Sequence, residues 1–239
     1  MEKLQDLKLS GMSKTNGGKF DQVEISGLGK IFGDLEANRI HISGSGNIEG
    51  SIKVNKMDVE GNGFVDGSVE SGELETSGNF RMSGQLKTET VKCSGRCRVD
   101  GSLKAGKVFS EGMISIGADV EAEEFYSKGA FTVNGLLNAN KIDIKLGMES
   151  RAKEIGGEEI VVKKMRHHNF NFFLTLIGKS NKLQSDLIEG TNIFLEYTEA
   201  KMVRGQDVKI GAKCSIDTIE FSGTLEVDPS SVVKDQKKV

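Results

Sequence analysis

Residues 20–36 read FDQVEISGLGKIFGDLE, and residues 37–53 read ANRIHISGSGNIEGSIK. The two stretches place apolar residues and glycines at the same positions, and five further 17-residue blocks continue the pattern to Asn138 without an insertion or deletion. The fourth, twelfth and sixteenth positions are apolar in every block, and the eighth is always glycine. A fixed period of this length is typical of a solenoid, in which each repeat forms one coil.

The spacing inside one block predicts the shape of that coil. Apolar residues fall at even positions, which is the two-residue period of a strand with one buried face. The block divides into short strands separated by corners, and glycine suits a corner where backbones approach closely. Stacked coils place each strand beside its copy in the next block, in parallel register. The sequence therefore predicts an all-β fold, a single-stranded parallel β-helix with triangular 17-residue coils.

Composition narrows the class of protein further. The chain has 239 residues and a formal net charge of −3, which argues against nucleic acid as the main partner. The N-terminal stretch at 1–19 lacks the apolar core of a signal peptide, and no stretch has the length of a transmembrane helix, so we expect a cytoplasmic protein. Cys93, Cys97 and Cys214 do not form a disulfide framework. We expect Cys93 and Cys97 to be buried thiols, and we expect no metal and no cofactor.

The regular pattern covers only part of the chain. We expect a flexible N-terminal tail at 1–19, the regular β-helix at 20–145, and an irregular continuation at 146–233. The pattern stops at 163–183, which we interpret as an interrupting segment, and 234–239 reads as a disordered tail.

Beyond Lys145 the template fits again if one residue is inserted. This insertion would place Glu149 and Arg151 on columns that are normally apolar. Near the end of the chain, three pairs of apolar residues are again separated by one period of the repeat: Met202 and Ile219, Val208 and Leu225, and Ile210 and Val227.

Two glycine-punctuated segments carry a family resemblance: VEISGLGKIFGDLEANRIHISGSGNIEGSI (23–52) and VDGSVESGELETSGNFRMSGQLKTETVKCSGRCRVDGSLKA (65–105). They resemble the bactofilins, the bacterial polymer-forming cytoskeletal proteins, over roughly residues 20–145. The resemblance implies a right-handed β-helix that polymerises end to end, without nucleotide, into non-polar filaments. It also implies a scaffold without enzymatic activity, which organises cell shape, envelope synthesis or motility, often at the membrane, and which a paralogous bactofilin can join.

Physics makes polymerisation plausible without the resemblance, because a solenoid ends in open strand edges and an apolar cross-section. We predict that the end faces form the polymerisation interface between copies of the chain. The candidates are Val23, Ile25, Ile31 and Leu35 at one end, and Ile219, Phe221, Leu225 and Val227 at the other.

The interrupting segment is the candidate for contact with a membrane or an envelope partner. It contains Phe170, Phe172, Phe173, Leu174 and Ile177 between basic flanks, a combination that favours an anionic membrane surface. The alternative is that these side chains pack against the side of the β-helix, since apolar stripes usually face a core.

An enzyme is the rival interpretation, because the left-handed hexapeptide acyltransferases also build triangular coils. Their period is one residue longer than the period of this chain, and they carry a catalytic histidine on extruded loops. The regular blocks of this chain hold one histidine, His41, at an outward strand position. Function belongs to sites rather than to folds, and these features favour a structural protein.

Overall fold

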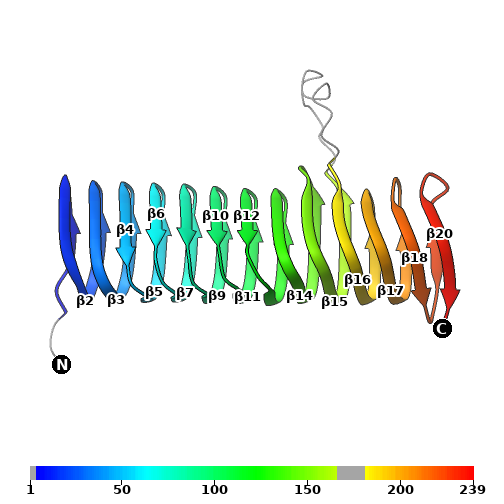
Figure 1. Cartoon of the computed structure of the whole chain (residues 1–239), viewed down its shortest axis with the longest axis horizontal. Helices are drawn as coiled ribbons and strands as arrows, with labels where there is room; N and C mark the ends of the chain where they lie inside the picture. Colours follow the sequence, from blue (N-terminus) through cyan, green and yellow to red (C-terminus); the bar gives the residue numbers. More distant parts are fainter. Residues whose placement is uncertain (1–3, 166–180) are drawn as a thin grey trace, which may run out of the picture. The chain divides into compact units, whose positions relative to one another are not determined.

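The computed structural model describes residues 4–165 and 181–239 of the chain, and all of its regular elements in these ranges are β-strands. The chain divides into two compact units, Met1–Ala122 and Glu123–Val239. Both units follow one building rule, in which strands of successive coils pair in parallel (Figure 1). The predicted all-β parallel solenoid is therefore confirmed.

The first unit contains twelve complete strands in its described residues. They are β1 (Leu7–Leu9), β2 (Met12–Ile25), β3 (Leu28–Ile42), β4 (Ser45–Glu49), β5 (Ile52–Val59), β6 (Asn62–Val65), β7 (Val69–Thr76), β8 (Asn79–Met82), β9 (Leu86–Cys93), β10 (Arg96–Val99), β11 (Leu103–Ser110) and β12 (Met113–Ile116). The chain passes into the second unit within β13 (Val120–Ser127).

Register in the first unit follows the 17-residue period. Met57 of β5 pairs with Leu74 of β7, and Leu74 pairs in turn with Val91 of β9. These three side chains come from the fourth position of their blocks, and each is completely buried. Each such burial contributes roughly 1.5–3 kcal/mol, so stacked identical columns supply the core of the coil.

The invariant glycines lie where the backbones of successive coils come closest. A Cβ atom built on Gly78 would lie 2.1 Å from the carbonyl oxygen of Gly61, and one on Gly112 would lie 2.0 Å from that of Gly95. No side chain fits at such a distance. The eighth position of the block is therefore glycine because of contact between coils.

The second unit begins with long strands and ends with short ones. They are β14 (Ala130–Leu146), β15 (Ser150–Lys164), β16 (Leu183–Leu195), β17 (Thr198–Ile210), β18 (Ser215–Phe221), β19 (Leu225–Val227) and β20 (Val232–Lys238). Ile142 pairs with Ile160, Ile160 with Ile193, and Ile193 with Val208. The step along the chain from one partner to the next is different in each of these pairs, so the coils of this unit differ in length.

The structure corrects the prediction of a single insertion near Lys145. Ser150 and Ala152, rather than Glu149 and Arg151, occupy the inward positions, where they are 1% and 0% exposed. Val133 pairs with Ala152, and Leu137 pairs with Ile155. Because of a register shift between these two pairs, the sequence separation of the second pair is one residue smaller than that of the first. The extra residues lie at the corner after Leu146, where they keep both charged side chains outside.

One pairing predicted near the end of the chain is also wrong. Val208 pairs with Leu225 and Ile210 with Val227, as expected. Ile219, however, pairs with Val203 and not with Met202, because the step from β17 to β18 is one residue shorter than the period of the repeat. A difference of one residue decides which of two apolar side chains faces inward.

Both predicted tails contain strands. Of residues 4–19, β1 and the start of β2 form a coil in which Leu7 pairs with Val23 and Leu9 with Ile25. Residues 234–238 belong to β20, where Lys234 forms an ion pair with Asp217 at 2.6 Å. Both segments are polar, and their composition alone indicates disorder. Pairing with a neighbouring strand holds them in the sheet.

Candidate polymerisation surfaces

The first described coil of the first unit is made by β1 and the first half of β2. Its inward side chains include Leu7 and Leu9, and Thr15 pairs with Ile31. β1 hydrogen-bonds to β2, and residues 12–19 of β2 hydrogen-bond to β3; within the described residues no strand pairs with their other edge. These segments therefore present a row of free backbone donors and acceptors.

The predicted candidates at this end lie one coil further in. Val23, Ile25, Ile31 and Leu35 are all at most 1% exposed, because the first coil covers them. The repeat does not reveal this coil, because register partners in β1 and the start of β2 are separated by one residue less than the full period. From Gly18 onward, the separation between register partners equals the full period. Gly17 lies at this register shift, where an added Cβ would be 2.2 Å from the carbonyl oxygen of Asp34.

The last described coil of the second unit is made by β19 and β20. Leu225 and Val227 lie on β19, are partly exposed, and pair on one side with β17. These two predicted candidates therefore belong to an end face. The other two, Ile219 and Phe221, lie on β18, one coil further in.

The coil that covers Ile219 and Phe221 is polar where the inner coils are apolar. Gln236 is the register partner of Ile219, and Lys238 is the partner of Phe221. The Lys238 Nζ atom lies 5.9 Å from the centre of the Phe221 ring, within the range of a cation–π contact. The end face of the second unit is therefore half apolar, through Leu225 and Val227, and half polar, through β20.

The predicted membrane or partner segment lies outside the described residues. Phe170, Phe172, Phe173, Leu174 and Ile177 all fall within residues 166–180. The described strands on either side of it are β15, which ends at Lys164, and β16, which begins at Leu183. These two strands pair in parallel with each other.

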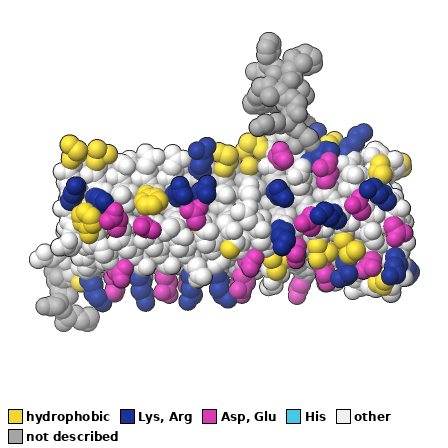
Figure 2. Space-filling model, viewed as in Figure 1, with side chains coloured by type: hydrophobic (Ala, Val, Ile, Leu, Met, Phe, Trp, Pro, Cys, Tyr) yellow, Lys and Arg dark blue, Asp and Glu magenta, His cyan; other side chains and the backbone are white. Residues whose placement is uncertain are grey.

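The sides of the first unit carry charged columns. One such column, which we call the charge ladder, consists of Lys19, Glu36, Lys53, Glu70, Lys87, Lys104 and Glu121. Lys19 lies 2.8 Å from Glu36, and Lys104 lies 2.7 Å from Glu121. The hydrogen bond from Lys19 holds the pKa of the Glu36 carboxyl below its usual value. Figure 2 shows acidic and basic side chains following one another along the lower edge of the view.

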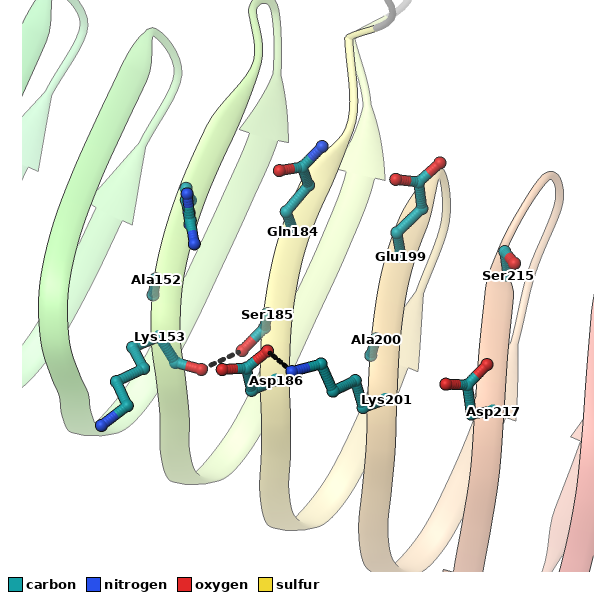
Figure 3. Close-up of a pocket in the computed structure, with 11 residues that line it drawn as sticks. Ala152, Lys153, Gln184, Ser185, Asp186, Glu199, Ala200, Lys201, Ser215 and Asp217 are labelled. Atoms are coloured by element: carbon teal, nitrogen blue, oxygen red, sulfur yellow. Dashed lines mark hydrogen bonds and ion pairs between the residues drawn. The ribbon is translucent and has the colours of Figure 1, made fainter.

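A shallow groove on the second unit gathers side chains from β15, β16, β17 and β18 (Figure 3). Asp186 pairs with Lys201 at 2.8 Å, and the hydrogen bond from this lysine lowers the pKa of Asp186. The Ser185 hydroxyl lies within hydrogen-bond distance of the carbonyl oxygens of Lys153, at 3.2 Å, and Leu187, at 2.9 Å. Backbone carbonyls do not activate a serine as a nucleophile, because activation needs a general base. The groove is a surface of ion pairs between coils.

Cys93, Cys97 and His41 take the positions that their columns predict. Cys93, Cys97 and Cys214 are free and buried, and burial raises the pKa of Cys93 to about 11. His41 of β3 lies in register between Glu24 and Asp58, at an outward position. Among the described residues no group of His, Cys, Asp and Glu side chains has the arrangement of a metal site.

Comparison with known proteins agrees with this architecture. Residues 4–87 match the model of the bactofilin family, described as polymer-forming cytoskeletal. The matched range includes the coil formed by β1 and the start of β2. The resemblance to the bactofilins that the repeat indicates is thus confirmed for this part of the chain.

Two curated relatives come from Bacillus subtilis (strain 168). YhbF is 43% identical over 106 residues, which cover 44% of this chain and 42% of the relative. YhbE is 41% identical over 110 residues, which cover 45% of this chain and 44% of the relative. The matched stretch therefore spans less than half the length of either protein. No solved structure matches the chain.

The described residues contain no helix with the length and hydropathy that a membrane crossing needs.

Proposed function

We propose that this protein is a scaffold whose copies join end to end into non-polar filaments, without nucleotide, by extending the β-sheet from one copy to the next. The match to a polymer-forming cytoskeletal family supports a filament-forming scaffold. The observation that carries the end-to-end mode is the open edge at each end coil. Residues 7–19 and the strands β19 and β20 pair on one side only among the described residues.

An open strand edge favours association because its N–H and C=O groups are already arranged for a partner strand. Leu7 and Leu9 at one end, and Leu225 and Val227 at the other, add apolar side chains to these edges. A joining copy would cover both the backbone groups and the apolar cross-section. These four residues replace the more deeply buried candidates as the centre of the proposed interface.

The filament would act in the cytoplasm, at the inner face of the membrane, in cell shape, envelope synthesis or motility. A paralogous bactofilin would join the same filament, since any chain with the same coil offers a compatible edge. The segment at 163–183 would contact the membrane or an envelope protein through its phenylalanines. These roles rest on the resemblance and on the sequence of that segment.

Electron microscopy of the purified protein tests the end-to-end mode. We expect filaments in negative stain without nucleotide, and we expect Leu225→Arg to convert them to short oligomers while the far-UV signal of β-structure stays unchanged. Glu226→Gln is the matched control, because it makes the net charge more positive by the same amount on the outward side of the same strand. Filaments that survive Leu225→Arg unchanged would contradict this interface.

Vesicle binding tests the role of the segment at 163–183. We expect the protein to sediment with anionic phosphatidylglycerol vesicles, and we expect the double variant Phe172→Glu, Phe173→Glu to remain in the supernatant. Equal behaviour of the two proteins would leave packing of these side chains against the chain itself as the better explanation.

An acyltransferase of the hexapeptide type is the alternative function. The matched family is a structural one, and His41 lies among charged neighbours on a regular strand, which gives the alternative less support. A discrete trimer that binds acyl-CoA, in place of filaments, would establish it.

A further inference from the structure

The outward side of the short strands in the first unit differs from the charge ladder in both composition and charge order. We call it the short-strand face, and define it as the outward residues of the start of β3 and of β4, β6, β8, β10 and β12, with the residue that follows each short strand where it is outward. Its six rows are Leu28, Lys30, Phe32; Ser45, Asn47, Glu49; Asn62, Phe64, Asp66; Asn79, Arg81, Ser83; Arg96, Arg98, Asp100; and Met113, Ser115, Gly117.

Several large apolar side chains are exposed on this face, and groups of such side chains are uncommon on a protein surface. Leu28 is 58% exposed, and Phe32, Phe64 and Met113 are 39%, 37% and 38% exposed. Aromatic residues, methionine and arginine are the types enriched in protein interfaces. The short-strand face combines all three, which marks it as a binding surface.

The charges of the face are separated rather than alternated. Arg81 and Arg98 are register partners on neighbouring strands, so two positive charges stack at the strand spacing of about 4.8 Å. Both bind one carboxylate, since Asp100 lies 3.0 Å from Arg81 Nη2 and 2.6 Å from Arg98 Nε. In the charge ladder, by contrast, most neighbours have opposite signs and satisfy each other within the chain. The stacked arginines leave positive charge for a partner to neutralise.

The net charges of the rows are complementary when the face is matched with a copy of itself whose rows run in the opposite order. The second row, with Glu49, and the third row, with Asp66, each carry one net negative charge. The fourth row, with Arg81, carries one net positive charge, and so does the fifth, where Arg96 and Arg98 outweigh Asp100. A second copy turned by a half-turn about an axis along the strands brings the third row against the fourth, and the second against the fifth. Every negative row then meets a positive one.

The same rotation matches uncharged side chains at the ends and the centre of the face. Leu28 faces Met113 of the second copy, which pairs two exposed apolar side chains from opposite ends of the face. Asn62 faces Asn79, and amide side chains can donate to and accept from each other.

The arginines meet suitable partners in this arrangement as well. Phe64 faces Arg81, so the guanidinium can lie over the aromatic ring. Asn47 faces Arg98, and an amide side chain can accept a hydrogen bond from a guanidinium. A parallel arrangement would instead place each row against a row of its own sign.

One pair of like charges also meets, because Glu49 faces Asp100. Each of these carboxylates already has a cation in its own chain, since Lys30 Nζ lies 2.5 Å from Glu49 and two arginines bind Asp100. These ion pairs within each copy reduce the repulsion between the two carboxylates.

We infer that the short-strand face binds the same face of a second copy of this chain, antiparallel and about a two-fold axis between β6 and β8. This is an isologous contact, in which each surface residue meets its own complement in the partner.

The area decides how strong the contact is. Six rows at about 4.8 Å and five residues at about 3.3 Å give roughly 500 Å² per copy. The total of roughly 1,000 Å² lies below the roughly 1,200 Å² of standard stable interfaces. A single pair of copies would therefore associate weakly, whereas two filaments would pair side by side through many such contacts. This part of the inference rests on the proposed end-to-end assembly.

Charge reversal tests the pairing with a rescue built in. Variant one is Arg81→Glu with Arg98→Glu, which makes rows four and five negative. Variant two is Glu49→Lys with Asp66→Lys, which makes rows two and three positive. We expect wild-type filaments to lie in pairs, each variant alone to give single filaments, and an equimolar mixture of the two, assembled separately and then combined, to restore pairs. The control is Lys53→Glu with Lys87→Glu on the charge ladder, which we expect to leave the pairs intact.

Two results would overturn the inference: pairs that persist in either variant alone, or a mixture that stays single. Single wild-type filaments would overturn it as well, while supporting the end-to-end mode, so the two proposals fail separately.

Cross-linking of unassembled protein gives a second readout that needs no filaments. Chains with Leu28→Cys are mixed at high concentration with chains carrying Met113→Cys and treated with a short bismaleimide. In a homodimer the two identical thiols would lie five strand spacings, about 24 Å, apart along the face, beyond the reach of this reagent. The native cysteines are at most 3% exposed, so the new thiols react first. We expect cross-linked heterodimers to exceed both homodimers at least several-fold. Equal amounts of all three products, or an excess of homodimers, would contradict the antiparallel register.

Discussion

Both units bury a column of apolar side chains inside stacked coils, but the length of the coil is constant only in the first unit. In the first unit every coil from β3 to β12 keeps one period, so each apolar side chain stacks on its counterpart and each corner glycine on a glycine. In the second unit the length of the coil changes from one coil to the next, yet Ile142, Ile160, Ile193 and Val208 still form one buried column. What both units preserve is therefore the inward column and not the length of the coil.

The difference shows where a coil tolerates change. The second unit places extra residues at the corner after Leu146, outside the stacked strands. The strands β15 and β16 pair directly although 18 residues separate Lys164 from Leu183 in the sequence. Between β3 and β12 the first unit has no such site, because its corners bring backbones together at glycine. The coil length is therefore constant where the corners bring two backbones into contact at glycine, which we call close corners. It varies where a corner has room for extra residues, which we call an open corner.

A single inserted residue gives the largest test of this contrast. An alanine between Cys97 and Arg98 moves Arg98 into the column of Val99, which is completely buried. We expect the free energy of unfolding to fall by about 3 kcal/mol or more, since a strand loses its inward side chain and buries a charge.

The matched control inserts alanine between Met148 and Glu149, at the open corner of the second unit. We expect a loss below about 1 kcal/mol, because longer loops cost little. Urea unfolding followed by far-UV circular dichroism measures both. Equal losses would mean that the second unit is as intolerant as the first.

Glycine substitution gives a somewhat smaller effect. In Gly78→Ala the new Cβ would overlap a carbonyl oxygen at 2.1 Å, and we expect a loss of roughly 1–3 kcal/mol. In Gly156→Ala the nearest atom is the side-chain Oδ1 of Asn138 at 3.1 Å, which can move aside. We therefore expect less than about 1 kcal/mol for the second variant, with thermal unfolding as the measurement. A larger loss for Gly156→Ala than for Gly78→Ala would contradict this difference in steric contact.

Thiol labelling compares how readily the two units open. Burial raises the pKa of Cys93 to about 11 and also raises those of Cys97 and Cys214, so all three thiols stay neutral at pH 8. Neutral, buried thiols react only when the structure opens. We expect Cys214 of the second unit to react with a thiol reagent several-fold faster than Cys97, as measured by mass spectrometry of peptides. Faster labelling of Cys97 would show that irregular coils do not weaken the fold.

Acid gives the smallest effect. Hydrogen bonds from Arg98 and Arg81, opposed in part by desolvation, lower the pKa of Asp100 in the first unit, and the bond from Lys201 lowers that of Asp186 in the second. A lowered folded-state pKa stabilises above the unfolded value of about 4, and this contribution is lost as the pH falls through the folded pKa. We expect a constant melting temperature between pH 5 and 8 and a decrease of a few degrees below pH 4. A decrease that begins at pH 6 would implicate other groups.

The repeat alone predicts much of the first unit, because its information is local and duplicated. Seven blocks report the same inward column, so β3 to β12 and the buried cysteines follow from spacing. The coil of β1 and early β2 does not follow, because one register shift at Gly17 breaks the period and no second copy of that shift exists to reveal it. β20 does not follow either, because its strand is polar, and strand pairing rather than composition places it in the sheet.

The candidate surfaces divide in the same way. Leu225 and Val227 follow from the repeat because they lie in the last apolar block. Val23 and Ile219 lie one coil further in than the repeat predicts, since a pattern of buried residues does not mark its own boundary. The short-strand face has no signal in the sequence. Its rows come together only when residues one period apart stack, and complementarity exists only between rows of a folded face.

Alternation along the chain is thus enough to define the period, the parallel sheet and the inward columns, because each of these depends only on the order of apolar and polar residues. Where the coils begin and end, which corners are close, and which charges stand beside each other became known only from the folded chain. Those properties depend on the register between strands, and one residue of register moves a side chain from the core to the surface.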